Sequence, residues 1–196
     1  MQTPEHYCTD PDAVPLDTMF KRGKGRGSRA LIIGQWPAAN GWRKTGKAFL
    51  TPEGEMLQSG KNPDALLEAF GLSLDDCAYT DLVKCYRGEG LRPLRSCIEG
   101  CWSLFERQLG SENFGLLILL GPPVWEVIGE KSKRRTFLRK GELVNVELSG
   151  SRYFVLPIWH TVHIYPPSSR ENRQIFEENS DELRTLLTKL NFSSDL

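Results

Sequence analysis

Residues that could do chemistry gather in four segments, each of which follows an apolar run. These segments mix glycine and proline with aromatic and polar side chains, and they are 34-GQWPAANGWRKTGKAF-49, 81-DLVKCYRGEGLR-92, 121-GPP-123 and 157-PIWHTVHIYPPSSREN-172. A plain connection between a strand and a helix needs only a few residues. The first and last segments are therefore either longer than a connection requires or enclose a bound molecule.

Aromatic and hydrogen-bonding side chains are combined in these segments. They include Trp36, Trp42, Trp159, Tyr165, Gln35, Asn40, Asp81 and Asn172. Aromatic walls with a few fixed hydrogen-bonding groups are what a flat heterocycle requires. The glycines and the Ser-Ser-Arg run at 168–170 suit a phosphate backbone, because backbone N–H groups, hydroxyls and a guanidinium can approach phosphate closely.

Alternating strands and helices are predicted to position these segments. The predicted strands are 30–34, 77–83, 115–121 and 153–159, with an edge strand near 142–148, and the helical patterns lie near 62–70, 93–109, 122–129 and 172–190. Three of the four main strands are almost continuously apolar, which suits strands buried on both faces. We therefore expect an α/β fold with three layers, α/β/α, around a central, mostly parallel four-stranded sheet. In such a sheet ligands bind beyond the carboxyl ends of the strands, where the four segments begin.

Composition limits the class of protein. Lys plus Arg and Asp plus Glu each total 25 in 196 residues, so no overall field favours nucleic acid or a membrane. No apolar run is long enough to span a membrane, and the first residues lack the pattern of a signal peptide. We expect a cytoplasmic monomer with a flexible basic arm at residues 1–29 and a single domain at residues 30–196.

Four motifs in order resemble those of the uracil-DNA glycosylase superfamily, whose enzymes flip a damaged base out of DNA and cut its N-glycosidic bond. The loop 34–49 is similar to that superfamily's Gly-x-x-Pro turn with its following Thr-Gly-x-x-Phe, spaced as in the single-strand-selective and archaeal-type branches. The stretch 80-TDLVKC-85 resembles Thr-Asn-Val-Val-Lys-Cys of the iron–sulfur thermophilic branch. The segments 116-LLILLGPPVWEVIG-129 and 156-LPIWHTVHIYPPSSR-170 resemble the strand-Gly-helix unit and the His-Pro-Ser motif. The resemblance covers about residues 30 to 190 and implies a uracil-DNA glycosylase-like fold.

The resemblance assigns roles in a base pocket. Phe49 matches the phenylalanine that stacks on the flipped base. Trp36 stands where many members have an acid or amide that orients the attacking water; it can do no acid–base work, and we expect it to line the base. Gln35 and Asn40 are expected at the water site, where departure of the base with oxocarbenium character reduces the need for a strong base.

Asp81 replaces the asparagine that reads the pairing edge of uracil in the iron–sulfur branch. An amide both donates and accepts hydrogen bonds, whereas a carboxylate only accepts unless it is protonated. Asp81 therefore selects a different base, acts in catalysis or caps a strand end. A dry pocket would raise its pKa and restore a donor.

The last motif allows two alignments. One places His160 at the motif histidine, which hydrogen-bonds the base oxygen as negative charge develops, and the other leaves Pro166 at that position. We expect His160 or His163 near the leaving base. Contacts with the DNA backbone are assigned to Ser168, Ser169 and Arg170 and to the basic run 131-KSKRRTFLRK-140, which includes Lys133, Arg134 and Arg135. The alternative is that this basic run is solvent-exposed surface with no bound partner.

Five cysteines are an odd number for a disulfide framework. The resemblance implies that Cys8, Cys85 and Cys101 match three of the four ligands of a [4Fe–4S] cluster, with Pro11 where the partner of Cys8 would stand. Cys97, or His6, would complete the set. The alternative is that these cysteines are core residues or the remnant of a lost cluster, since Cys97 and Cys101 fall on the apolar stripe of the helix 93–109.

These features together predict a DNA glycosylase, a hydrolase of base excision repair that acts on DNA carrying a deaminated base such as uracil. One alternative is a noncatalytic module of the same fold that binds nucleic acid or a free base, which Trp36 and Asp81 favour. The cysteines favour another, a redox or cluster-bearing protein.

Overall fold

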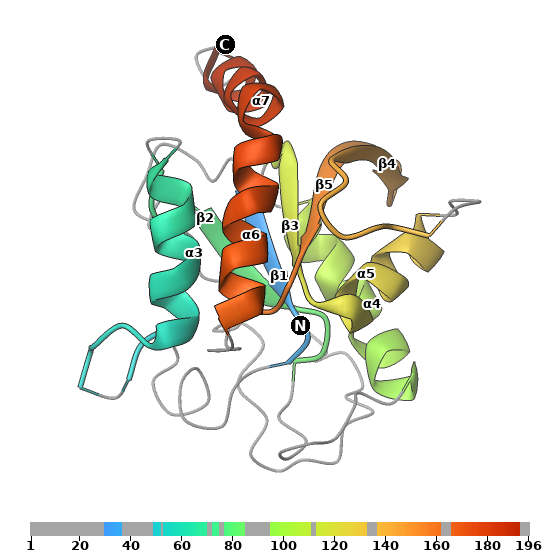
Figure 1. The fold of residues 1–196 in the computed structure, drawn as a ribbon. Helices are drawn as coiled ribbons and strands as arrows, with labels where there is room; N and C mark the ends of the chain where they lie inside the picture. Colours follow the sequence, from blue (N-terminus) through green and yellow to red (C-terminus); the bar gives the residue numbers. More distant parts are fainter. Residues whose placement is uncertain are drawn as a thin grey trace.

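The computed structural model describes residues 30–36, 49–51, 53–69, 72–74, 77–84, 95–110, 113–132, 137–161 and 166–192. The elements follow the chain in the order β1 (Ala30–Gly34), α3 (Gln58–Glu68), β2 (Cys77–Asp81), α4 (Arg95–Leu109), β3 (Leu116–Leu120), α5 (Pro122–Lys131), β4 (Val144–Leu148), β5 (Ser151–Ile158), α6 (Pro166–Glu178) and α7 (Ser180–Phe192) (Figure 1). Within these ranges no helix has the length and apolar character needed to cross a membrane.

The strands form one sheet in the order β2-β1-β3-β5-β4. The pairings of β1 with β2, β1 with β3 and β3 with β5 are parallel, and β4 pairs antiparallel with β5. The predicted mostly parallel α/β sheet is confirmed, but it has five strands and not four, because the edge strand expected near 142–148 is β4 and belongs to the same sheet. A tight hairpin adds β4, because Ser149 and Gly150 both take positive φ values, 53° and 80°, as a two-residue type I′ turn requires.

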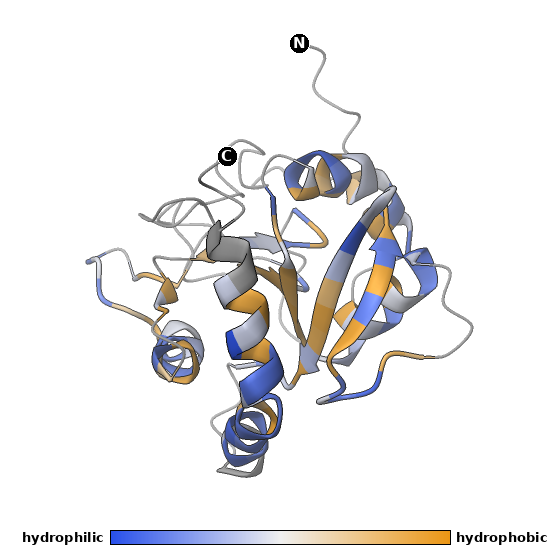
Figure 2. Ribbon diagram, turned by 90° about the horizontal axis from the view of Figure 1, so that it is seen from above, coloured by the Kyte–Doolittle hydropathy of each residue, from blue (hydrophilic) through white to orange (hydrophobic). Residues whose placement is uncertain are grey.

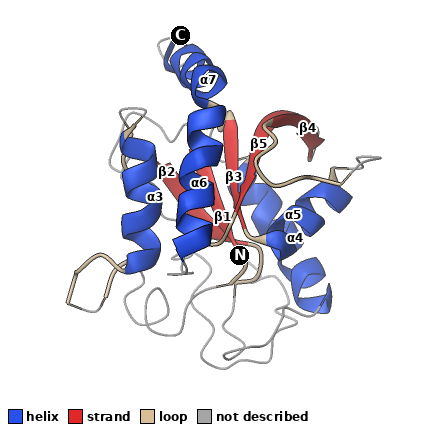
Figure 3. Cartoon of the chain, viewed as in Figure 1, coloured by secondary structure: helices blue, strands red, loops and turns tan. Residues whose placement is uncertain are grey.

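Helices cover both faces of this sheet, which confirms the three layers (Figure 3). On one face α4 and α5 bury apolar side chains such as Phe105 and Ile128. On the other face α3, α6 and α7 bury residues such as Leu67, Ile175 and Leu187. Every residue of β1 and β3 is buried, and the hydrophobic residues concentrate in the strands and on the sides of helices that face them (Figure 2).

The end of the chain differs from the sequence prediction. The single helix expected at 172–190 is two helices, α6 and α7, separated at Asn179. The Asn179 side chain donates from Nδ2 to the carbonyls of Gly141 at 3.0 Å and Ile175 at 2.8 Å. The stretch 166–172, expected to be a loop, forms the first turns of α6, because the paired prolines at its start suit helical positions whose N–H groups need no partner.

Candidate functional site

The carboxyl ends of the four parallel strands lie at one edge of the sheet. In spatial order, β2 ends at Asp81, β1 ends at Gly34, β3 leads into Gly121 and β5 leads through Trp159 into His160. The inner two strands thus end in residues without side chains. The outer two lead to polar side chains that can fill the space above the inner ones.

Asp81 and His160 each lie beside one of these glycines. A Cβ built on Gly34 would lie 2.2 Å from Asp81 Oδ1, so the carboxyl stands where a side chain of β1 would be. A Cβ built on Gly121 would lie 3.5 Å from His160 Cβ. Each of these two glycines therefore leaves room for a polar residue that follows from a neighbouring strand, Asp81 of β2 beside β1 and His160 after β5 beside β3.

Tyr79 joins the Asp81 carboxyl to the ring of Phe49. The Tyr79 hydroxyl donates to Asp81 Oδ1 at 2.9 Å, and its ring meets the Phe49 ring edge-on with centroids 4.5 Å apart. Phe49 has a φ of 65°, a left-handed conformation that is unusual for a bulky residue. Gly60, in the first turn of α3, makes room for it, since a Cβ there would lie 2.7 Å from Phe49 Cβ. The residues predicted to stack on a base and to read it therefore belong to one cluster.

The Asp81 carboxyl is fully buried. Among the described residues no donor reaches its Oδ2 atom. Burial raises the pKa of Asp81 from its ordinary 3.8 to about 7, although the Lys84 charge and the Tyr79 hydrogen bond act to lower it. Buried polar atoms nearly always have a partner, so Oδ2 is the atom of this strand end that a ligand would satisfy.

Lys84 is a fully buried cation on the α4 side of the same strand end. Its Nζ donates to Thr80 Oγ1 at 2.6 Å, to Gln108 Oε1 at 2.7 Å and to the main-chain carbonyl of Asp81. Three acceptors match the three N–H groups of an ammonium. Burial lowers the pKa of Lys84 to about 7, and the charge of Asp81 opposes that change. Lys84 thus fixes the end of β2 against α4 and places a positive charge behind Asp81.

Gln35 and Trp36 continue β1 beyond its last residue. Val83 N donates to the Gln35 carbonyl at 3.0 Å, which extends the pairing with the chain after β2. Trp36 is half-buried and packs against Val83 and Cys97 of α4. Of the three predicted base-binding residues, Phe49 and Asp81 therefore share a cluster on the α3 side, whereas Trp36 packs towards α4.

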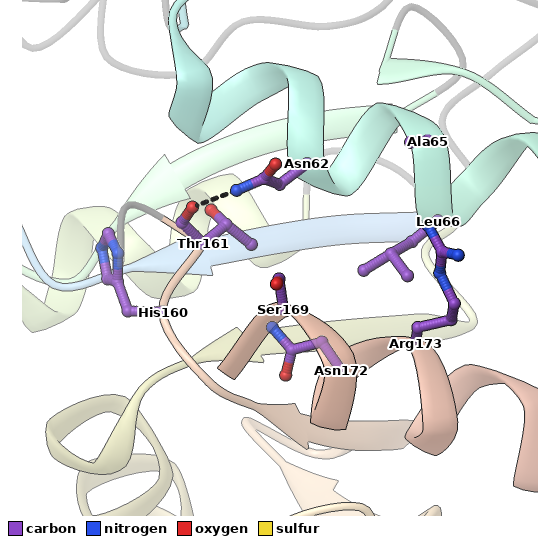
Figure 4. A pocket seen from close by; sticks show the side chains of 8 residues that line it. All are labelled: Asn62, Ala65, Leu66, His160, Thr161, Ser169, Asn172 and Arg173. Carbon is purple, nitrogen blue, oxygen red and sulfur yellow. Dashed lines mark hydrogen bonds between the residues drawn. The ribbon is translucent and has the colours of Figure 1, made fainter. Parts of the chain in front are cut away.

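His160 lies at one end of a cavity of about 80 Å³ between α3 and α6 (Figure 4). The cavity is lined by Asn62, Ala65, Leu66, His160, Thr161, Ser169, Asn172 and Arg173. The residue after His160 is held from α3: Asn62 Nδ2 donates to the Thr161 carbonyl at 2.8 Å, and Thr161 Oγ1 donates to the Ser59 carbonyl at 3.0 Å. The Ser59 carbonyl has no helical N–H to accept, because the residue four positions later is Pro63.

From the other side, α6 holds the residue before His160. Asn172 accepts from Trp159 N at 2.9 Å and donates to the Trp159 carbonyl at 3.1 Å. The Trp159 ring is covered by Lys140, whose Nζ lies 4.8 Å from the ring centroid. His160 is thus placed by fixed backbone on both sides. Among the predicted phosphate contacts, Ser169 lines the cavity and Arg170 is exposed.

Several predicted site residues lie outside the part of the chain that the structure describes. They are Asn40, His163, Lys133, Arg134, Arg135, Cys8, Cys85 and the side chain of Ser168. Their roles stay predictions.

The cysteines on α4 behave as core residues. Cys97 and Cys101 are buried. Lys84 N donates to Cys101 Sγ at 3.5 Å, and burial raises the pKa of the Cys101 thiol. Within the described ranges no three His, Cys, Asp or Glu side chains converge as metal ligands. Cys97 and Cys101 alone cannot supply the four thiolates of an iron–sulfur cluster. No chemistry is therefore assigned to such a cluster.

Tyr79 and Lys84 were not among the residues predicted from the sequence. Side chains at positions i and i+2 of a strand lie on the same face, so the spacing of Tyr79 and Asp81 does carry a signal. Lys84 follows the strand, and its burial depends on Gln108 of α4, which lies 24 residues further along the chain.

One of the comparisons with known proteins found a match. The family model described as the uracil DNA glycosylase superfamily matches residues 20–191. No curated protein matches the chain significantly.

Proposed function

This chain belongs to the uracil DNA glycosylase superfamily, and from that membership we propose that it hydrolyses the N-glycosidic bond of a deaminated base, such as uracil, in DNA. Membership supports a DNA glycosylase-type function in general, with DNA as the bound partner. The atoms to be attacked are inaccessible in a stacked duplex, so the target nucleotide is extruded into the carboxyl edge of the sheet.

The observation that best supports this proposal is the cluster of Phe49, Tyr79 and Asp81 at the carboxyl edge of the sheet. It combines an aromatic ring with a buried carboxyl oxygen that no described residue satisfies. A flat heterocycle needs both kinds of contact. Stacking on a ring contributes roughly 1–3 kcal/mol per base, which offsets much of the few kcal/mol that unstacking costs.

Each residue has a separate task in this proposal. Phe49 stacks on the flipped base and Asp81 reads its pairing edge. His160 hydrogen-bonds a base oxygen as the C1′–N bond breaks and the base takes up the electron pair. Gln35, with Asn40, orients the water that adds to the sugar C1′, and the water's second proton leaves to solvent. The oxocarbenium character of the sugar in the transition state allows a weakly activated water to react.

The proposal also includes contacts with the DNA backbone, the domain organisation and the oligomeric state. Ser168, Ser169 and Arg170 at the start of α6 and the basic residues Lys133, Arg134 and Arg135 contact phosphates. Residues 30–196 act as one domain after the arm at 1–29. The protein works as a cytoplasmic monomer.

A noncatalytic base- or DNA-binding module is the second candidate, and Trp36 is the residue that favours it. This residue holds the position where an acid or amide would orient water, and its ring packs against Val83 and Cys97. An indole has one N–H donor and no group that accepts a proton. A chain without a water-orienting acid still binds an extruded base through Phe49 and Asp81.

Single-turnover cleavage separates the two candidates. Labelled oligonucleotides carrying uracil, hypoxanthine or xanthine, single-stranded and opposite each normal base, are incubated with excess protein and the abasic product is counted. We expect excision of at least one base, reduced strongly by His160→Ala. Binding of every oligonucleotide without any abasic product would reject the glycosylase and leave the binding module.

A further inference from the structure

The Tyr79 hydroxyl fixes how the Asp81 carboxyl is presented. Both side chains project from one face of β2, and the hydroxyl donates to Oδ1 at 2.9 Å. Gly34 provides the space, because a Cβ there would lie 2.2 Å from Oδ1 and 2.4 Å from the Tyr79 oxygen. Burial and the nearby Asp81 charge raise the pKa of Tyr79, so the phenol remains a donor. Asp81 Oδ1 is therefore occupied by its hydrogen bond with the Tyr79 hydroxyl.

Oδ2 is the atom left to contact a ligand. It is buried, and no described residue donates to it. Because Oδ1 faces the Tyr79 O–H, a proton on the neutral carboxyl would sit on Oδ2. Oδ2 is consequently a hydrogen-bond acceptor when Asp81 is ionised and a donor when Asp81 is neutral.

The charged and titratable groups around Asp81 lower its pKa while Lys84 is protonated, but burial lowers the pKa of Lys84 itself to about 7, so this support weakens as the pH rises. In the described part of the chain these groups are Tyr79 on β2, Lys84 after β2 and, against Lys84, Cys101 on α4. Gly34 of β1 and the Phe49 ring bring no charge. Only Lys84 is positive, and its ammonium is held by three oxygen acceptors. It stabilises a carboxylate at Asp81 against the cost of burial.

We propose that Tyr79 determines base specificity: by occupying Oδ1 it leaves Oδ2 as a single acceptor, which reads a ring N–H on the pairing edge of the flipped base. The inference rests on the function proposed above and narrows its substrate class. Uracil and hypoxanthine carry such a protonated ring nitrogen. Cytosine and adenine present a ring lone pair there, which a carboxylate repels. Deamination of cytosine or adenine replaces this lone pair by an N–H, which thymine and guanine also carry, so Oδ2 would separate uracil from cytosine and hypoxanthine from adenine.

The test measures binding rather than cleavage, so that it is independent of catalysis. Oligonucleotides carry 2′-fluoro-deoxyuridine, whose glycosidic bond resists hydrolysis, or the same nucleotide methylated at N3. Fluorescence anisotropy gives their affinity ratio one pH unit below and one unit above the Asp81 pKa of about 7. We expect the preference for the N3–H base to rise about tenfold or more with pH, as for a hydrogen bond to a charged group.

Two variants test the roles of Asp81 and Tyr79. Asp81→Asn still rejects the N3-methyl group sterically, but its affinity ratio should not change with pH. In Tyr79→Phe the ring keeps its contact with Phe49 and loses the hydrogen bond that lowers the pKa of Asp81. The pH midpoint of its preference should therefore move upward. Tyr153→Phe, a buried tyrosine on β5, should leave the midpoint unchanged.

The outcomes distinguish this inference from the glycosylase itself. A wild-type preference that is independent of pH, or one with the same pH dependence in Asp81→Asn, would overturn the role of Oδ2. An unchanged midpoint in folded Tyr79→Phe would overturn the role of Tyr79, and if that variant does not fold, the comparison with Asp81→Asn still decides the role of Oδ2. A pH-dependent preference without cleavage of unmodified uracil would reject the glycosylase function. It would still support Asp81 Oδ2 as the atom that contacts the base.

Discussion

Replacing Gly34 by alanine should destabilise the protein through two identified atoms. The added Cβ would lie 2.2 Å from Asp81 Oδ1 and 2.4 Å from the Tyr79 oxygen, and the next atom, Tyr79 Cζ, is 3.3 Å away. Ordinary carbon contacts begin near about 3.5 Å, so both polar atoms must move. Their movement disrupts the 2.9 Å hydrogen bond between Tyr79 and Asp81.

The size of the effect follows from these distances. Overpacking of a well-packed site typically costs about 1–3 kcal/mol. In a background with Asp81→Ala and Tyr79→Phe both close atoms are gone, and only Cζ at 3.3 Å remains near the new methyl group. The loss of unfolding free energy on Gly34→Ala should then fall below about 1 kcal/mol, because the two close atoms are absent. Non-additivity of this size is usual for residues in contact.

Urea denaturation of the four proteins in this cycle measures the coupling. Gly129→Ala is the matched control: a Cβ there would lie 3.5 Å from Leu138 Cγ, an ordinary contact, and alanine is the better helix former by up to about 1 kcal/mol. The control should therefore be neutral or stabilising. An equal loss of stability on Gly34→Ala in both backgrounds would refute the proposed contact as the cause.

Three further predictions concern the same edge of the sheet. Because the folded-state pKa of Asp81 is raised, the stability it contributes is present below its ordinary pKa of 3.8 and is lost as the pH rises to about 7. The unfolding free energy of wild type, measured relative to Asp81→Asn, should therefore decrease across that range, and a constant difference would contradict the raised pKa. Phe49→Ala should weaken binding of a uracil-containing oligonucleotide about 5- to 150-fold, from the stacking energy of roughly 1–3 kcal/mol. Phe154→Ala, which removes an exposed ring in the middle of β5, should not weaken binding, and equal losses would argue against stacking by Phe49. Thr161→Val removes the bond to the Ser59 carbonyl and should cost about 1 kcal/mol of stability, with slower cleavage because His160 is adjacent. Thr185→Val, which breaks an exposed bond within α7, should leave cleavage unchanged.

Local patterns were sufficient to predict most of the elements. The run 30–34 is β1 as expected, because continuous apolar residues leave few alternatives to a strand buried on both faces. The helix expected at 93–109 is α4, Arg95–Leu109, and its stripe of apolar residues is buried. The last helix was predicted as one because the residues on either side of Asn179 are both helical in pattern. The break depends on Asn179 binding Gly141, a contact across 38 residues.

The candidate site was predicted residue by residue, but its connections were not. Phe49, Asp81 and His160 were identified by their motifs, and the first two lie in one cluster. The contact between Asp81 and Gly34 arises from the pairing of β1 with β2, in which these residues are opposite each other. That register is set by the packing of whole strands, which no single motif encodes. The burial of Lys84 requires Gln108 of α4 and is nonlocal in the same way.

In the proposed recognition of the base, Gly34, Tyr79 and Asp81 together leave one atom, Oδ2, to determine whether the site accepts or donates a hydrogen bond. The glycine admits the carboxyl and the tyrosine oxygen, and the tyrosine commits Oδ1, so only the group at the position of Oδ2 is left to face a base. With aspartate ionised, that group accepts a hydrogen bond. With asparagine in the same geometry, Tyr79 still donates to the amide oxygen, and the amide nitrogen becomes a donor at the position of Oδ2. An exchange at position 81 would then reverse the polarity of base reading without movement of the backbone, because the tyrosine holds either side chain by the same bond.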